Sequence, residues 1–336
     1  MKVELNIKNI LPAGREQGLI GIYFYALIFV IGSVFVVDVF GLKVLKFEAS
    51  VGRSLADMIG FMFMMSGLFV VSKMKRYHDL WRLIHIEKWM PVFFCVAYVM
   101  VFSMAALVFQ SLFVAIDAPL IDGTLIKLDA SLGFHWQDLA AWYLAHPKIK
   151  CLFYYFYVSW PFQIFITICA LSMAGKIDGL FEFVFMFSCA TAISIVIGGI
   201  FPASNPFFHY GIVGKYASSG WSQFYPLRDG SLRTVDFSIH QGLVSFPSMH
   251  AAGAVLFAYA VRDIKYLAEV SVIVNIVMAV SAIYFGAHYL VDIASGIALS
   301  FILIFLCKSI GDSRKFSGIH QGKLIVDISS KKHDFQ

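Results

Sequence analysis

Hydrophobic residues in this chain gather into long continuous runs and do not alternate with polar residues. An apolar run of about 20 residues can cross the hydrocarbon core of a bilayer as a helix, whereas a membrane β-strand shows a shorter alternating pattern. The pattern therefore predicts an all-α fold, a polytopic membrane helical bundle of about eight spans. We place the spans at Leu19–Phe40, Leu55–Ser72, Met90–Ile116, Cys151–Met173, Gly179–Ile200, His250–Val261, Leu267–Gly286 and Tyr289–Cys307, of which the sixth is the shortest.

Composition supports lipid as the main solvent of the chain. Hydrophobic residues make up 60% of the sequence and charged residues 14%, and the mean hydropathy is +0.78. A soluble domain carries about 25% charged residues, so a water-exposed surface could not be covered here. The net charge of +5 is small, and no basic stripe interleaved with aromatic residues occurs, so we do not expect nucleic acid as a partner.

The five cysteines all lie inside apolar runs, where they act as small hydrophobic residues. Their spacing suggests neither a disulfide framework nor a metal cluster. We therefore expect no metal and no cofactor.

Two long polar connections, residues 117–150 and 201–248, separate the spans, and a polar tail covers residues 308–336. If the N-terminus is cytoplasmic, most of the 26 Lys and Arg residues fall on the cytoplasmic side. The positive-inside rule then favours an even number of spans with both termini inside. Both long connections would face outward, and the tail would be cytoplasmic. The first apolar run is too long for a signal-peptide core, so we expect it to be a retained span.

The segment before the sixth span has the pattern of an anion-binding helix start. Pro247 is typical of a helix entrance, and the Ser248 hydroxyl can cap the free backbone N–H groups of the first turn. The dipole and unpaired donors of a helix start favour a negative group such as phosphate. His250 is predicted to stand beside this place.

A second segment joins the last two spans and contains His288 and Asp292. On a helix, residues four apart share a face, so this carboxylate could fix the tautomer of the imidazole and leave its other nitrogen as a nucleophile. Gly286 would let a phosphoryl group approach the backbone closely.

A third segment of the outer loop supplies two guanidinium groups, Arg228 and Arg233. Cations of this kind hold phosphoryl oxygens during transfer, although charged loop residues often only solvate a turn. We interpret the other histidines of the connections as solvated, with contact to lipid headgroups as an alternative for the two on the basic cytoplasmic connection, His78 and His85. The histidines in question are His78, His85, His135, His146, His209 and His240.

Each histidine could be an ordinary polar residue at the membrane boundary. However, ionisable groups close to apolar helices are costly unless they pair or function. The two patterns also lie at consecutive outer helix ends. We therefore favour a functional interpretation.

These segments resemble the type-2 phosphatidic acid phosphatase superfamily. The resemblance rests on residues 247–250 (Pro-Ser-Met-His) and on Ser281 through Gly286-Ala287-His288 to Asp292, and it covers residues 90–307. It implies a six-helix phosphatase-like core at 90–307, preceded by a two-span extension at 1–89. It also implies His288 as the nucleophile that forms a phosphohistidine, Asp292 as its orienting partner and His250 as the acid that protonates the leaving alcohol. Ser248 and Gly286 would contact phosphate oxygens.

The chain departs from the family pattern in two ways. The family's first motif, a lysine followed seven residues later by Arg-Pro, is absent, and Ala282 stands where the family has an arginine. Arg228 and Arg233 could replace these cations. The third motif without its arginine, together with residues 128–133, is similar to the branch that contains inositol phosphorylceramide synthase.

We expect a bacterial inner-membrane enzyme that hydrolyses lipid phosphate esters at a site facing the periplasm. A lipid phosphotransferase is the alternative enzyme, because the same phosphohistidine serves hydrolysis and transfer. A catalytically silent lipid-binding or transport protein is the third possibility, and the sequence leaves the substrate lipid and the oligomeric state open.

Overall fold

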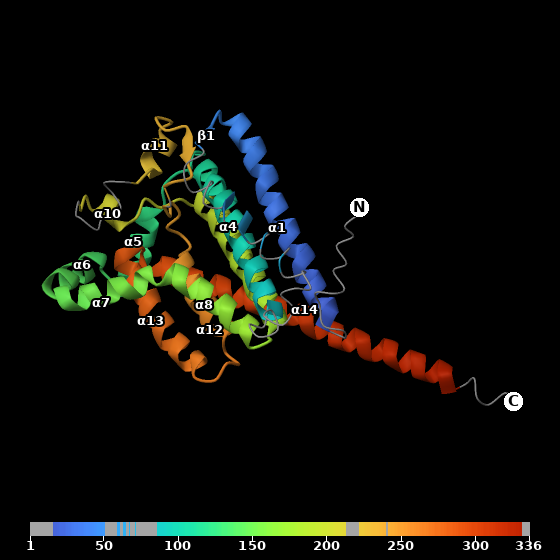
Figure 1. Cartoon of the computed structure of the whole chain (residues 1–336). Coiled ribbons are helices and arrows are strands. Elements are labelled where there is room, and N and C mark those ends of the chain that lie inside the picture. The colour runs from blue at the N-terminus through green and yellow to red at the C-terminus, as the bar shows by residue number, and fades with distance from the viewer. Residues whose placement is uncertain are drawn as a thin grey trace.

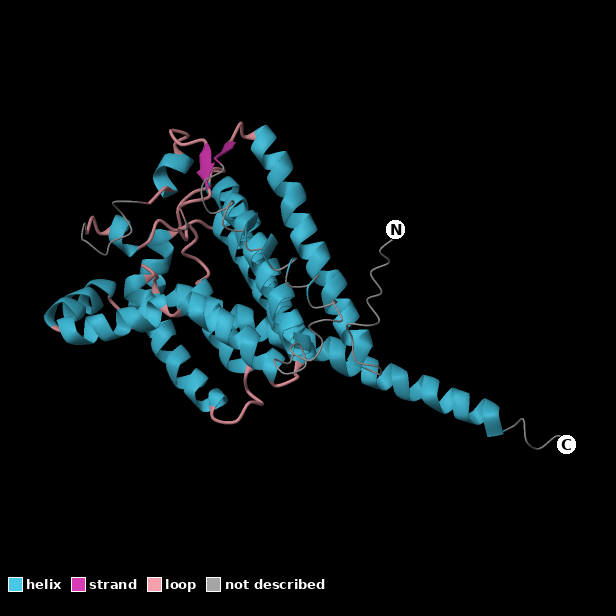
Figure 2. Cartoon of the chain, viewed as in Figure 1, coloured by secondary structure: helices cyan, strands magenta, loops and turns pink. Residues whose placement is uncertain are grey.

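The computed structural model describes residues 16–50, 59, 60, 63, 64, 67, 71, 86–212, 222–239 and 241–330. Most of the predicted second span, Leu55–Ser72, lies outside these residues, as do His78, His85 and His240. Helices dominate the described chain, and the strands β1 (Glu48–Ser50) and β2 (Thr234–Asp236) form one short parallel pair (Figure 2).

Five described helices are long and apolar enough to cross a membrane. They are α1 (Glu16–Val44), α4 (Ile86–Val114), α9 (Ile177–Ile200), α13 (Leu267–Phe285) and α14 (Leu290–Ser330), of which the candidate span in α14 is Leu290–Ile310. This confirms the all-α polytopic membrane class. Beyond the predicted end of the last span, α14 continues as a helix and projects from the bundle (Figure 1).

The predicted continuous span Cys151–Met173 is a bent pair of helices, α7 (Pro147–Val158) and α8 (Trp160–Met173), which meet at 47°. The bend has a local cause, because Pro161 offers no backbone N–H and its ring crowds the carbonyl four residues earlier. At the break, the Ser159 hydroxyl donates to the carbonyl of Phe156 at 2.6 Å.

The sixth predicted span corresponds to α12 (Met249–Ala260), an apolar helix of 12 residues that is shorter than a full span. It lies inside the bundle against α8, α9, α13 and α14. Its Gly253 faces the Trp160 ring so closely that an added Cβ would lie 2.2 Å from a ring carbon. Backbone and indole can meet there because the residue has no side chain.

The shorter helices gather around one end of the bundle (Figure 1). They are α5 (Asp122–Ser131), α6 (Trp136–Ala145), α10 (Pro206–His209) and α11 (Phe224–Arg228). They come from the two long polar connections, and α5 packs against α14.

A buried carboxylate of α5 caps the last span. Asp129, 3% exposed, accepts the backbone N–H groups of Leu290 at 2.9 Å and Val291 at 3.0 Å. Burial raises the pKa of the Asp129 carboxyl, and these two N–H groups act in the opposite direction. The contact satisfies donors that every helix start leaves free, and it ties the first turn of α14 to a segment about 160 residues away.

Asp122, on the same helix, fixes the residue before α14. Its Oδ1 accepts the Tyr289 hydroxyl at 2.7 Å, and both its oxygens lie within 3.1 Å of the backbone N of Ser204. Hydrogen bonds to the carboxylates of Asp122 and Asp129 therefore fix the segment between α13 and α14.

We predict that Asp129→Ala lowers the free energy of unfolding by about 1–3 kcal/mol, since two buried N–H groups lose their acceptor. Reversible unfolding in mixed micelles measures the change. Asp138→Ala serves as the control, because Asp138 is an exposed carboxylate of α6. Equal stability of the two variants would show that the cap contributes little.

Candidate active site

His288 lies in the turn between α13 and α14, and not on a helix as we predicted. α13 ends at Phe285, Gly286 follows as its C-cap, and Ala287 adopts a left-handed φ of 54° that breaks the helix. Tertiary contacts fix this turn, because the Ser245 hydroxyl lies 3.4 Å from the carbonyl of Ala287. His288 still meets Asp292, with Nδ1 3.4 Å from Oδ2.

The Asp292 carboxylate is fully buried, and one of its oxygens accepts hydrogen bonds from a side chain and from the backbone. Its Oδ2 accepts the Ser245 hydroxyl at 2.8 Å and the backbone N–H of Tyr289 at 2.9 Å. The carboxylate is thus fixed beside Nδ1 of His288, and an N–H at Nδ1 leaves Nε2 with its lone pair. Nε2 lies on the side of Gly286, where an added Cβ would be only 3.0 Å away.

Ser248 links the start of α12 to α14. Its hydroxyl accepts the backbone N–H of Ala251 at 3.4 Å, as the sequence predicted for a cap, and its own N–H donates to the carbonyl of Asp292 at 3.0 Å. The two helices approach closely here, since a Cβ added at Gly296 would lie only 2.2 Å from the Ser248 carbonyl oxygen. Ser248 is fully buried, so its side chain serves the helix start in this arrangement.

His250 follows in the first turn of α12 and lies between two aromatic rings. Tyr157 stacks on it with centroids 4.4 Å apart and an angle of 18°, and Trp160 lies at 4.7 Å. These rings come from the two sides of the α7–α8 bend, so the bend places both on one imidazole. The centroids of His250 and His288 are 6.5 Å apart.

Both imidazoles line one cavity of about 730 Å³. Its wall also includes Gly286, Ser245 and Asn205, together with Ser222 and residues 241–244 of the connection between α9 and α12. Within the described chain, no Lys, Arg, Asp or Glu side chain lines this cavity. The pair of histidines with Asp292 behind them is therefore its main chemical feature.

Arg228 and Arg233 do not line the histidine cavity. Nη2 of Arg228 lies 2.7 Å from Oδ1 of Asp117 and 2.7 Å from the carbonyl oxygen of Ala118. The guanidinium of Arg233 covers the ring of Phe47 at 5.2 Å. Arg228 therefore joins its loop to the segment after α4, and Arg233 joins the same loop to the segment after α1; contact of either arginine with phosphate stays a prediction.

Other polar groups also stand apart from the site. His135, His146 and His209 are exposed, in keeping with the interpretation as solvated residues. Among the residues that the structure describes, no three His, Cys, Asp or Glu side chains are grouped closely enough to hold a metal ion.

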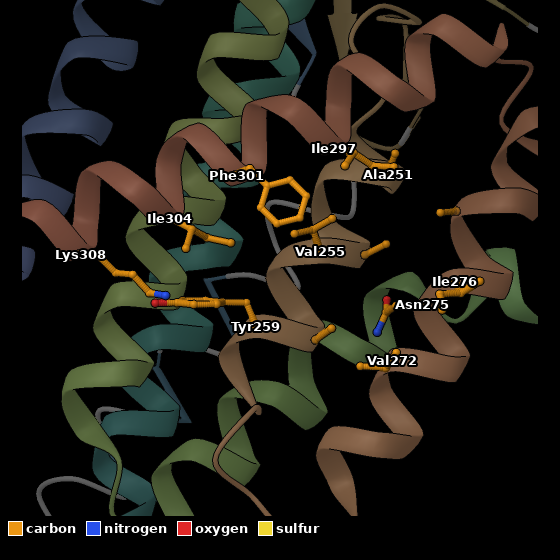
Figure 3. Close-up of a pocket in the computed structure, with 13 residues that line it drawn as sticks. Ala251, Val255, Tyr259, Val272, Asn275, Ile276, Ile297, Phe301, Ile304 and Lys308 are labelled. Carbon is orange, nitrogen blue, oxygen red and sulfur yellow. The ribbon is translucent and has the colours of Figure 1, made fainter. Parts of the chain in front are cut away.

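A separate groove of about 490 Å³ lies between α12, α13 and α14 (Figure 3). Side chains such as Val255, Ile276 and Phe301 from the three helices line it, with Asn275 on α13 and Lys308 near one end. The groove is mainly apolar and contains neither histidine. Phosphate chemistry is better supported by the histidine cavity.

Sequence reasoning missed Ser245, Asp122 and the aromatic pair Tyr157 and Trp160, and it singled out the segment 128–133 without foreseeing that Asp129 caps α14. Ser245 stands three residues before Ser248, and this closeness was a weak local signal. The others act across more than 80 residues of sequence, where no local pattern points to the contact.

Comparison with known proteins agrees with the resemblance at the level of the phosphatase superfamily. The chain is 25% identical to phosphatidylglycerophosphatase B of Bacillus subtilis (strain 168) over 89 residues, which is 23% of this chain and 44% of that protein. The match thus spans less than half the length of the curated relative. No solved structure matches the chain.

The model of the PAP2 superfamily matches residues 123–306, more than half of the chain. The matched range runs from α5, which holds the turn before α14, through both histidines to the end of the last span. The chain belongs to the PAP2 superfamily.

Proposed function

We propose that this protein hydrolyses lipid phosphate esters through a phosphohistidine intermediate. The observation that carries the proposal is the placement of two imidazoles, with centroids 6.5 Å apart, in one cavity, with a buried carboxylate behind one of them. Membership of the PAP2 superfamily supports it. The name of the Bacillus subtilis relative, phosphatidylglycerophosphatase B, denotes a lipid phosphatase as well.

In the first step, Nε2 of His288 attacks phosphorus while the bond from phosphorus to the lipid oxygen breaks. The Asp292 carboxylate stabilises the positive charge that develops on the ring, because it accepts the Nδ1–H. His250 gives its proton to the departing alkoxide, so that a neutral lipid alcohol leaves.

In the second step, water attacks the phosphohistidine. His250, now neutral, takes a proton from the water as the new P–O bond forms and the P–N bond breaks. Inorganic phosphate leaves, and both imidazoles return to their starting states.

The environment of each histidine suits its proposed role. Asp292 and Ser245 surround Nδ1 of His288, whereas Nε2 faces the cavity beside Gly286. Tyr157 stacks on the His250 ring and Trp160 packs against it, so the two rings hold His250 in place on the wall of the cavity that it shares with His288.

Transfer of the phosphoryl group to a second lipid alcohol is the alternative reaction. A cavity of about 730 Å³ has room for a phosphoryl group together with part of a second molecule, and Tyr157, Trp160, Phe224 and Phe285 are among its wall residues. The resemblance of residues 128–133 to the inositol phosphorylceramide synthase branch points the same way. The chemistry differs only in which hydroxyl attacks the phosphohistidine.

We place the site on the outer face of a bacterial inner membrane. The basic residues put both long connections outside, and the histidine cavity lies where these connections cover the helix ends. The lipid phosphate would enter from the outer leaflet.

We predict that His288→Ala lowers phosphate release from a panel of lipid phosphates more than roughly 1,000-fold, because the nucleophile is gone. His209→Ala, which removes an exposed histidine of the loop, should retain wild-type activity. Circular dichroism checks that both variants are folded. Full activity of folded His288→Ala would end the proposed mechanism.

We predict that His250→Ala is impaired roughly 100-fold to 10,000-fold with a lipid phosphate, as expected for loss of a general acid. With p-nitrophenyl phosphate, whose leaving group needs little protonation, the loss should be much smaller. The comparison of kcat for the two substrates tests the role. An equal loss for both would argue against His250 as the acid.

A further inference from the structure

Asn205 lies on the wall of the histidine cavity, in the segment that joins α9 to the short helix α10. Its backbone has a φ of 90° and a ψ of 159°, a conformation that is essentially reserved for glycine. A residue with a side chain is strained in this conformation, and such strain is typical of residues that have a function in a site. The side chain of Asn205 is therefore a candidate for contact with the substrate.

The two ends of the Asn205 amide have different surroundings. Oδ1 accepts the backbone N–H of Phe208 at 3.2 Å and so caps α10. Because the amide is planar, its Nδ2 is turned away from that N–H. Within the described structure Nδ2 has no hydrogen-bond partner, yet it is not shielded from solvent. Its N–H groups are therefore free to donate to a molecule in the cavity.

A buried carboxylate joins the segment of Asn205 to the turn that presents His288. Oδ2 of Asp122 lies 2.9 Å from the backbone N of Ser204, and its Oδ1 accepts the Ser204 hydroxyl at 3.0 Å. The same Oδ1 accepts the hydroxyl of Tyr289 at 2.7 Å. Asp122 thus fixes the residue before Asn205 relative to the residue after His288.

A phosphoryl group in this cavity needs donors for its charged oxygens. Within the described chain these donors must be uncharged, because no Lys or Arg side chain lines the cavity. Two hydroxyls of the wall are already engaged, since Ser204 donates to Asp122 and Ser245 donates to Asp292. A side-chain amide can stabilise negative charge that develops on oxygen, and Asn205 has such an amide with free N–H groups.

We propose that Asn205 is a further phosphate-binding residue of the site, and that its Nδ2 donates a hydrogen bond to a phosphoryl oxygen. This inference rests on the proposed function, in which Nε2 of His288 attacks the same phosphorus. The amide stabilises the charge on the oxygens during attack and transfers no proton itself. It thereby takes over part of the role of the cations that the motifs of this chain lack.

Two substitutions at one position test the donor. Asn205→Asp keeps the cap of α10 and the shape of the side chain but has no N–H, so kcat/KM for a lipid phosphate should fall roughly tenfold to a hundredfold at an unchanged unfolding temperature. Asn205→Gly removes the donor without adding charge and adopts a positive φ without strain, and it should lose activity to a similar extent. His209→Asp is the matched control, because it adds a carboxylate at an exposed position of the same helix, and it should retain wild-type activity.

Wild-type kcat/KM in either Asn205 variant would contradict the proposal, as would an equal loss in His209→Asp. Binding of inorganic phosphate, measured as the rise in the unfolding temperature of the full chain, separates this inference from the proposed function. A smaller rise in both Asn205 variants than in His209→Asp supports the donor even if the wild type releases no phosphate from lipids. An equal rise in all three variants, or no rise in the wild type, overturns it even if turnover is normal.

Discussion

The buried carboxylate of Asp292 is the constraint on which the site depends. A buried carboxylate needs hydrogen-bond donors, and Oδ2 of Asp292 meets the Ser245 hydroxyl, the Tyr289 backbone N–H and the His288 ring, whereas Oδ1 has no partner among the described residues. The carbonyl of the same residue accepts the N–H of Ser248 at the start of α12. The contacts of this one residue therefore join the loop before α12, the turn after α13 and the first turn of α14. These three segments carry the proposed chemistry.

The polar connections stabilise the same place from outside the apolar bundle. Irregular backbone near a bilayer needs internal partners for its N–H and carbonyl groups. Asp129 and Asp122 of α5 provide them for the residues between α13 and α14, so the turn that presents His288 can stay non-helical. The α7–α8 bend places two aromatic rings on His250 in the same way. The placement of the two imidazoles thus results from capping by buried carboxylates and from aromatic packing.

The cavities also fit an amphiphilic substrate. The histidine cavity has hydroxyl, amide and imidazole groups on its wall, whereas an adjoining cavity of about 310 Å³ between α4, α8 and α9 is mostly apolar with a few polar groups. A phosphoryl group beside the histidines and a lipid alcohol beside α9 would each meet a matching surface. Because the alcohol would stay close to His250 after cleavage, the same arrangement is compatible with hydrolysis and with transfer to another hydroxyl.

The sequence by itself determined the membrane-spanning class, most span positions and the pairing of His288 with Asp292, because hydropathy and short motifs are local properties. Only the tertiary structure decided that His288 stands in a turn, that Cys151–Met173 is bent, and that Arg228 pairs with Asp117 outside the histidine cavity. It also revealed Ser245, Asp129 and Tyr157, whose partners lie 43 to 161 residues away along the chain or pack across helices. Such contacts follow from which polar groups are buried together, and burial is set by the packing of distant segments.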